Sequence, residues 1–215
     1  MMTIAFVTHH HIAPSESFVA GRLFGTSIKD VLEEPIRTPK TDIPHNFGPI
    51  SKRDQILFTS ERPGNAPKEG AHDAVQKEKV DEWISFMKSK GIKHVLVLLD
   101  ANELEIYPEQ GLIELYKAGG MEAHLTPMGN ESSFSHVMDI LRSVEQNNEK
   151  AVTHCTGGTR RAGRVAAAWL STRYNLTPRE ATEEAIDAAL EGGVQRGGDV
   201  EKLVNWMERS SRIKI

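Results

Sequence analysis

Cysteine is nearly absent from this sequence, and long apolar runs are missing. The single cysteine among 215 residues, Cys155, excludes an intrachain disulfide and a multi-cysteine zinc site, and it is typical of a reducing compartment. The longest strongly apolar run, residues 95–99, is far shorter than the roughly 20 residues of a membrane-spanning helix. The first residues have no basic segment leading into an apolar stretch, so no secretory signal is predicted. We therefore expect a cytoplasmic protein with no membrane partner.

An excess of positive charge is also missing. The formal net charge is −4, which argues against a nucleic-acid partner bound through a broad basic face but leaves room for a local anion site. Hydrophobic residues make up 39% and charged residues 26%, as in ordinary globular proteins. The length suits one domain of somewhat above-average size.

Regular structure is expected over residues 55–215, preceded by an irregular N-terminal extension over residues 1–54. The extension holds half of the prolines, and we expect it to pack on the domain with a short strand at 3–7 and a helical turn at 27–32. Further on, Val80, Trp83, Ile84 and Met87 have the spacing of one buried helix face. Strands are predicted at 56–58, 95–99, 122–127 and 151–153, and helices at 80–90, 109–118, 133–145, 164–174, from 178, and 200–207. This alternation predicts a three-layer α/β fold with a central, mostly parallel sheet flanked by helices.

The informative segment is residues 152–163, which read VTHCTGGTRRAG. Cys155 is expected at the end of a strand, and Arg161 where the loop enters a helix. Backbone N–H groups of a glycine-bearing loop at a helix N-terminus can converge on an anion, and a guanidinium can hold two phosphate oxygens at once. The same positive field favours a thiolate, while His154 is expected behind the loop, helping to fix the cysteine. The predicted phosphate ligands are Thr156, Gly157, Gly158, Thr159, Arg160 and Arg161.

Several other polar residues have plainer interpretations. Arg160 and Arg164 are interpreted as surface arginines, the alternative being that Arg160 holds a second phosphate. Asp100 is assigned to a turn or helix cap, and the segment 62–64 to a turn whose arginine could line the pocket rim. The histidines at 9–11 would point to alternating sides of an extended chain without other ligands at a recognisable spacing, so neither a metal nor an organic cofactor is expected.

The pattern of His154, Cys155, five residues and Arg161 resembles the active-site loop of cysteine-dependent protein tyrosine phosphatases, and the short chain resembles their dual-specificity branch. The two-glycine form is similar to that of the cyclin-dependent-kinase-associated phosphatase and of related microbial proteins. The resemblance extends loosely over residues 56–207 and implies a phosphatase-like catalytic domain. By that resemblance, Cys155 attacks phosphorus to form a phosphocysteine, Arg161 stabilises the phosphoryl oxygens, and water hydrolyses the intermediate.

Two positions depart from the family pattern. Residues 127–131 correspond to the segment that usually carries a general-acid aspartate, but Asn130 stands in its place and Glu131 is the nearest carboxyl group. The family generally has serine or threonine where this chain has Ala162, and loss of that hydroxyl should slow hydrolysis of the intermediate. Phosphatases for RNA 5′-triphosphate ends share the loop and also work without the aspartate.

The sequence therefore predicts a phosphomonoester hydrolase, first of all a protein tyrosine or dual-specificity phosphatase acting on a phosphorylated protein. The alternatives are a weak pseudophosphatase that binds phosphorylated ligands, and a phosphatase for a non-protein phosphate such as an RNA 5′ end or a phosphoinositide. A rhodanese-type sulfurtransferase, which also uses a cysteine loop, is disfavoured by the spacing of His154 and Arg161.

Overall fold

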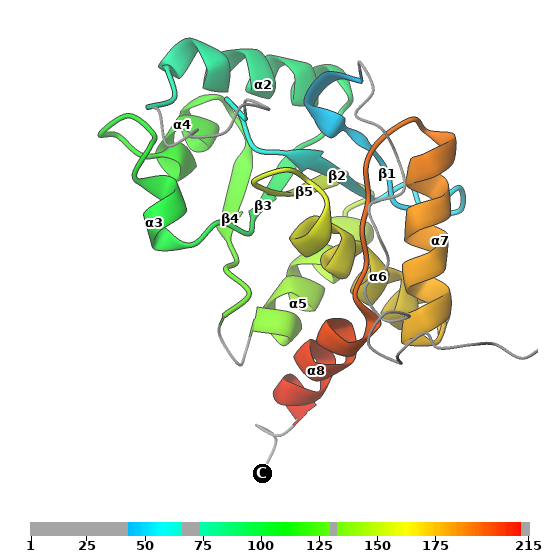
Figure 1. Ribbon diagram of the computed structural model, residues 1–215. Helices are drawn as coiled ribbons and strands as arrows, with labels where there is room; N and C mark the ends of the chain where they lie inside the picture. The colour runs from blue at the N-terminus through cyan, green and yellow to red at the C-terminus, as the bar shows by residue number, and fades with distance from the viewer. Residues whose placement is uncertain (1–42, 66–73, 130–132, 212–215) are drawn as a thin grey trace, which may run out of the picture.

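The computed structural model describes residues 43–65, 74–129 and 133–211, which form a five-stranded sheet covered by helices on both faces (Figure 1). The strand order is β1-β2-β5-β3-β4; β1 is antiparallel to β2 and the other neighbours are parallel. The strands are β1 (Gly48–Pro49), β2 (Leu57–Glu61), β3 (His94–Val97), β4 (Glu122–Leu125) and β5 (Ala151–Cys155). The helices are the 3-10 turn η1 (Pro44–Asn46), α2 (Lys77–Ser89), α3 (Ala101–Leu104), α4 (Leu112–Ala118), α5 (Ser133–Gln146), α6 (Arg160–Tyr174), α7 (Pro178–Glu191) and α8 (Val200–Ser211).

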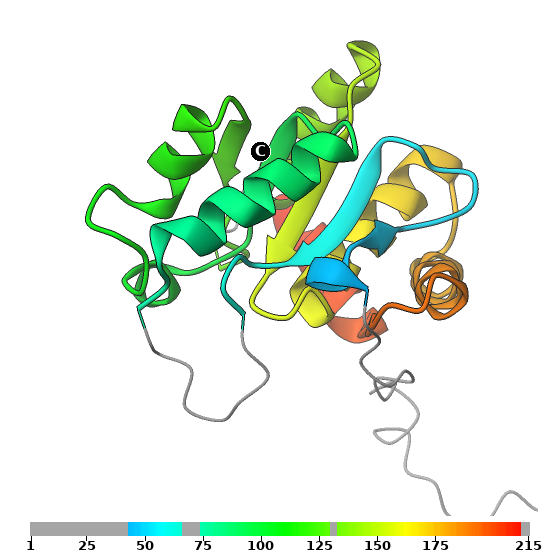
Figure 2. The ribbon, with the colours of Figure 1, turned by 90° about the horizontal axis from the view of Figure 1, so that it is seen from above.

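The alternation of side chains along β3 divides the core into two layers. Val95 and Val97 belong to the cluster under α2 and α4, whereas Leu96 belongs to the cluster formed with α5, α6, α7 and α8. Figure 2 shows α2 lying across one face of the sheet. The expected three-layer α/β fold is confirmed. A strand buried on both faces, such as β3, needs helices on both sides of the sheet.

Most predicted elements are found, with shifted boundaries. The helix predicted from Val80 is α2, whose apolar stripe is buried, and α7 begins with a capping box between Thr177 and Glu180. The helix predicted from residue 164 instead starts at Arg160, inside the glycine motif, and α3 was not predicted. None of the helices in the described ranges is long and apolar enough to span a membrane.

Residues 43–54 are joined to the domain at the edge of the sheet. β1 pairs with β2, and the carboxylate of Asp54 is fully buried. One oxygen of Asp54 accepts the backbone N–H groups of residues 56 and 57, and the other accepts hydrogen bonds from Trp169 (2.9 Å) and Arg173 (2.6 Å) of α6. The strand and helical turn predicted at 3–7 and 27–32 lie outside the described residues, and the boundary at residue 54 stays a prediction.

Candidate active site

Cys155 lies at the carboxyl end of β5, between the parallel strands β2 and β3. Its side chain is buried, with 4% of the residue exposed. The backbone N–H of Arg62, which follows β2, donates to the Cys155 carbonyl at 3.0 Å. The segment 156–159 then connects the strand to α6, the predicted order of strand, glycine loop and helix.

The carbonyl groups of this loop are held by residues outside it. The carbonyl of Thr156 accepts a hydrogen bond from the backbone N–H of Arg62 (3.3 Å), and that of Gly157 accepts one from the side-chain amide of Asn46 (3.0 Å). The carbonyl of Gly158 accepts one from the guanidinium of Arg196. In a trans peptide the C=O and the following N–H point in opposite directions. The N–H groups of residues 157–159 are therefore directed to the inner side of the loop, as an anion cradle requires.

Gly158 is a position where the loop needs glycine. Its φ is +68°, and a Cβ added there would lie 2.4 Å from the backbone carbonyl of Ser60. Backbone atoms cannot yield as a flexible side chain could, so the loop packs against the end of β2 only with hydrogen at this position.

Arg161 is fixed in the first turn of α6 by a carboxylate that the sequence analysis did not single out. Its two terminal nitrogens lie 2.5 and 2.6 Å from the two oxygens of Glu103, in a bidentate pair. The guanidinium also donates to the carbonyl of Leu98 (2.8 Å) and to the hydroxyl of Thr156 (2.9 Å). Thr156 in turn donates to Glu103 at 2.5 Å. The pair thus holds the arginine beside the loop.

Glu103 is ionised in this arrangement. Burial by itself would raise its pKa, but hydrogen bonds from Arg161 and Thr156 outweigh burial and lower the pKa to about 2. Glu103 ends a capping box that begins at Asp100, the residue that was correctly assigned to a helix cap. That spacing of Asp and Glu was the signal available in the sequence, but only the fold brings the short helix to Arg161.

His154, the residue before Cys155 on β5, is fully buried, and its expected role in fixing the cysteine stays a prediction. Its Nε2 is 3.0 Å from the hydroxyl of Tyr116 on α4. Burial, followed by the positive charges of Arg161 and Arg62, lowers the pKa of His154 to about 3, and burial raises the pKa of Tyr116. Both groups are therefore neutral near pH 7, which suits His154 to supporting the strand end rather than to transferring protons.

Three guanidinium groups interact electrostatically with Cys155: those of Arg161, Arg164 and Arg196. Arg164, interpreted as a surface arginine, is half-buried: its Nε is buried without a hydrogen-bond partner within the described ranges, and burial lowers its pKa. Burial also lowers the pKa of Arg196 to about 10. Arg160 is exposed, as the plainer interpretation predicted. The positive field around the thiol is thus larger than the motif alone indicated.

The two family departures have different outcomes. Ala162 is fully buried in α6, where it packs in the core beneath the loop. Asn130 and Glu131 lie outside the described residues, so the general-acid hypothesis for these positions stays a prediction.

Solved structures with a similar fold point to one class of protein. The structure of kinase associated phosphatase, with its catalytic-site cysteine substituted by serine, has a TM-score of 0.60 and 22% identity, and the match covers 81% of this chain and 98% of that one. The active form of Tk-PTP has a TM-score of 0.55 and 20% identity over 80% of this chain and 99% of that one. The fold is that of the cysteine-dependent protein tyrosine phosphatases.

Sequence comparison narrows the class to one family. The family model Cyclin-dependent kinase inhibitor 3 (CDKN3) matches residues 21–182, and the chain belongs to this family. The pig (Sus scrofa) protein named cyclin-dependent kinase inhibitor 3 is 30% identical over 171 residues, which cover 76% of this chain and 78% of the relative. The human (Homo sapiens) protein of that name is 28% identical with the same coverage. These matches confirm the expected placement in the dual-specificity branch of the superfamily.

Proposed function

We propose that this protein hydrolyses phosphomonoesters through a covalent intermediate on Cys155, with phosphorylated protein as the first candidate substrate. The observation that carries the proposal is the loop from Cys155 to Arg161, whose carbonyls are tied outward and whose arginine is held beside it by Glu103. Family membership supports the same class of reaction.

The proposed reaction has two steps. The thiolate of Cys155 attacks phosphorus, so that an S–P bond forms while the P–O bond to the leaving group breaks. The inward N–H groups and Arg161 stabilise the charge on the three non-bridging oxygens. Water then attacks phosphorus, the S–P bond breaks, and inorganic phosphate and the thiolate are released. No metal or organic cofactor takes part in this scheme.

The leaving group requires a proton when it is a poor one. Glu103 is unsuited to donate it, because its pKa of about 2 keeps it ionised near neutral pH. The remaining candidate within the expected segment is Glu131, since the amide of Asn130 is not an acid. If Glu131 does not act, the protein should cleave nitrophenyl phosphate far faster than a phosphoserine peptide. The ratio of these two rates should exceed the same ratio in a relative with a positioned acid by up to about 10²- to 10⁴-fold.

The central experiment removes the nucleophile. Cys155→Ser is expected to abolish turnover of nitrophenyl phosphate while phosphate binding, followed by calorimetry, is retained. Rapid acid quench of the wild type should trap phosphate on Cys155. Ser171→Cys adds a thiol elsewhere in α6, and the double variant with Cys155→Ser should stay inactive. Turnover that survives Cys155→Ser would refute the mechanism.

A phosphate-binding pseudophosphatase is the second candidate, favoured by two specific features. Asn130 replaces the expected acid, and Ala162 replaces a hydroxyl residue. Single-turnover release of nitrophenolate separates the two functions: a pseudophosphatase binds phosphate at the loop but shows no release even with this good leaving group. A panel with phosphotyrosine and phosphoserine peptides, a phosphoinositide and RNA 5′-triphosphate would identify the substrate class, and fractionation would test the expected cytoplasmic location.

A further inference from the structure

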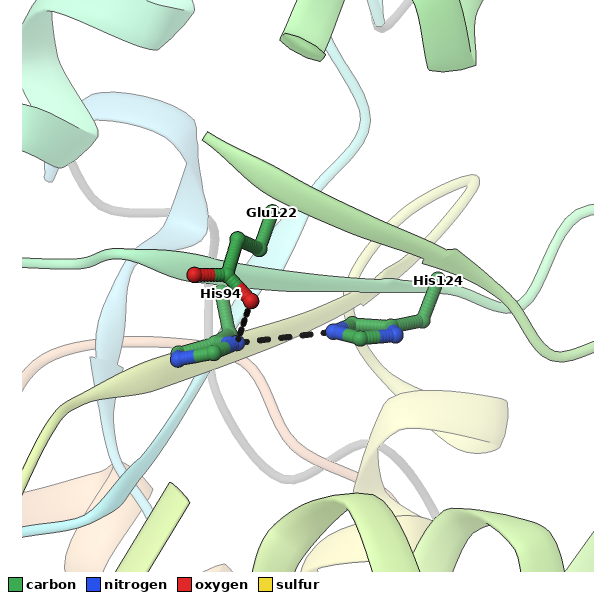
Figure 3. A group of neighbouring side chains, drawn as sticks. All are labelled: His94, Glu122 and His124. Atoms are coloured by element: carbon green, nitrogen blue, oxygen red, sulfur yellow. Dashed lines mark hydrogen bonds and ion pairs between the residues drawn. The ribbon is translucent and has the colours of Figure 1, made fainter. Parts of the chain in front are cut away.

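A second group of polar side chains lies at the amino-terminal edge of the sheet, opposite the candidate active site. His94 is the first residue of β3 and pairs with Glu122, the first residue of β4, while His124 is two residues further along β4. Residues two apart on a strand share a face, so Glu122 and His124 project to the same side of β4. Figure 3 shows the side chains of His94, Glu122 and His124 converging.

The distances within this histidine–glutamate cluster match those between the ligands of one metal ion. The Nδ1 of His94 lies 3.4 Å from the Nε2 of His124 and 3.6 Å from the Oε2 of Glu122. One nitrogen or oxygen from each of the three residues lies within 4.8 Å of the others. Zinc bonds of about 2.0–2.2 Å in a tetrahedral site put neighbouring ligand atoms about 3.3–3.6 Å apart. Two of the three separations are therefore already those of a tetrahedral zinc site.

A second carboxylate orients the central histidine. The Nε2 of His94 lies 2.5 Å from the Oε2 of Glu149, and His94 is buried, with a side-chain exposure of 7%. When Nε2 carries the proton shared with Glu149, Nδ1 presents a lone pair to Glu122 and His124. Carboxylate–histidine pairs of this kind fix the ring and raise its basicity as a metal ligand.

The charges around the cluster are compatible with a divalent cation. Lys93 lies 3.6 Å from the Oε1 of Glu122, whereas the Oε2 faces His94. Lys93 also pairs with Glu149. The oxygen directed at the cluster is therefore not the one nearest the lysine. Two imidazoles and two carboxylates beside one ammonium leave a net negative site.

We propose that His94, Glu122 and His124 bind a divalent zinc-class metal ion, with Glu149 as the group that orients His94. Two imidazoles and one carboxylate form a donor set that zinc takes in proteins, with a fourth position left for water. The ion joins β3 to β4, the edge strand of the sheet, at the end farthest from Cys155. The site is thus a clamp on the sheet edge and does not enter the phosphatase reaction.

The test must remove competing zinc ligands elsewhere in the chain. The background is the full chain with Cys155→Ser, His9→Gln, His10→Gln and His11→Gln. Zn²⁺ is titrated against a chromophoric chelator, and Co²⁺ replaces it to give the visible absorption of a four-coordinate site. We expect one equivalent of Zn²⁺ to bind, with affinity falling at least about tenfold in both His124→Gln and Glu122→Gln.

Three further variants test the orienting residue and serve as controls. Glu149→Gln should weaken Zn²⁺ binding by about 10- to 100-fold while a four-coordinate Co²⁺ spectrum is retained at saturation. His45→Gln and Glu114→Gln, outside the cluster, should leave the affinity unchanged. His124 is half-buried and Glu122 is exposed, so we expect His124→Gln and Glu122→Gln to fold.

The proposal is overturned if the folded background binds no Zn²⁺ at millimolar concentration, or if His124→Gln and Glu122→Gln bind it as well as the background. In that case the four side chains form only a hydrogen-bonded and ion-paired network.

Discussion

The two ends of the parallel strands, here called the carboxyl edge and the amino edge of the sheet, hold their polar groups by different means. At the carboxyl edge, a contiguous loop from Cys155 to Arg161 presents backbone N–H groups, and its shape depends on hydrogen bonds to its carbonyls. At the amino edge, side chains from β3 and β4 converge only because parallel pairing sets His94 opposite Glu122. His94 pairs with Ala151, four residues before Cys155, which places the edges about 13 Å apart along the strands.

This contrast teaches where each region is vulnerable. Anion binding by the loop is lost when one of its peptides rotates or when Arg161 is replaced by a residue without a guanidinium. Metal binding by the side-chain cluster is lost when one donor atom is removed. Changes at one edge should therefore leave the other edge intact. Glu122→Gln tests that expectation, and three changes at the carboxyl edge test how far the loop depends on its contacts.

The largest effect is expected at Arg161. Arg161→Lys should lose nearly as much kcat/KM on nitrophenyl phosphate as Arg161→Ala, about 10²- to 10³-fold, because an ammonium can reproduce neither the bidentate pair with Glu103 that fixes the side chain nor a forked contact with phosphate. The matched control is Arg179→Lys on the exposed face of α7. A lysine variant within a few-fold of wild type would show that no bidentate contact is made. Glu122→Gln, at the opposite edge, should not change kcat/KM.

The next effect concerns the stability provided by Glu103. Its pKa of about 2 in the folded protein lies below the ordinary value of 4.5, so its contribution is complete above pH 4.5 and is lost as the pH falls towards 2. Glu103→Gln should reduce the free energy of unfolding at pH 7 by at most about 3 kcal/mol, and the difference from wild type should shrink below pH 4.5. Urea unfolding at several pH values measures it, with Glu114→Gln as control. A difference that does not vary with pH would contradict the ion pair.

The smallest effect is expected at Asn46, whose amide donates to the carbonyls of Gly157 (3.0 Å) and Gln195 (3.1 Å). Asn46→Asp keeps a residue that tolerates its positive φ of 48° but removes the donor. Without the side-chain N–H donor, these two carbonyls lose a hydrogen-bond partner, which should lower the free energy of unfolding by about 1–3 kcal/mol. We also expect kcat to fall about tenfold, because the loop peptides are less firmly oriented. Asn148→Asp, at an exposed turn with a φ of 53°, is the matched control. Equal behaviour of the two variants would show that the loop keeps its shape without Asn46.

Much of the fold was predictable because its signals are local. Three examples depend only on residues close together in the sequence: the apolar stripe of α2, the capping box at Thr177 and the strand β3, which is buried on both faces. The early start of α6 at Arg160 was missed because a glycine motif and two arginines carry no apolar periodicity. The short helix α3 was missed for the same reason.

The sequence by itself determined the class of site: a cysteine at a strand end, a glycine loop, and an arginine at the start of a helix, within seven consecutive residues. Local covalent spacing suffices for that pattern. The tertiary structure alone decided that Glu103 pairs with Arg161, that Asn46 and Arg196 hold the loop carbonyls, and that His94 meets Glu122 and His124. These partners are separated by tens of residues, and strand register and helix packing bring them together, which no local pattern records.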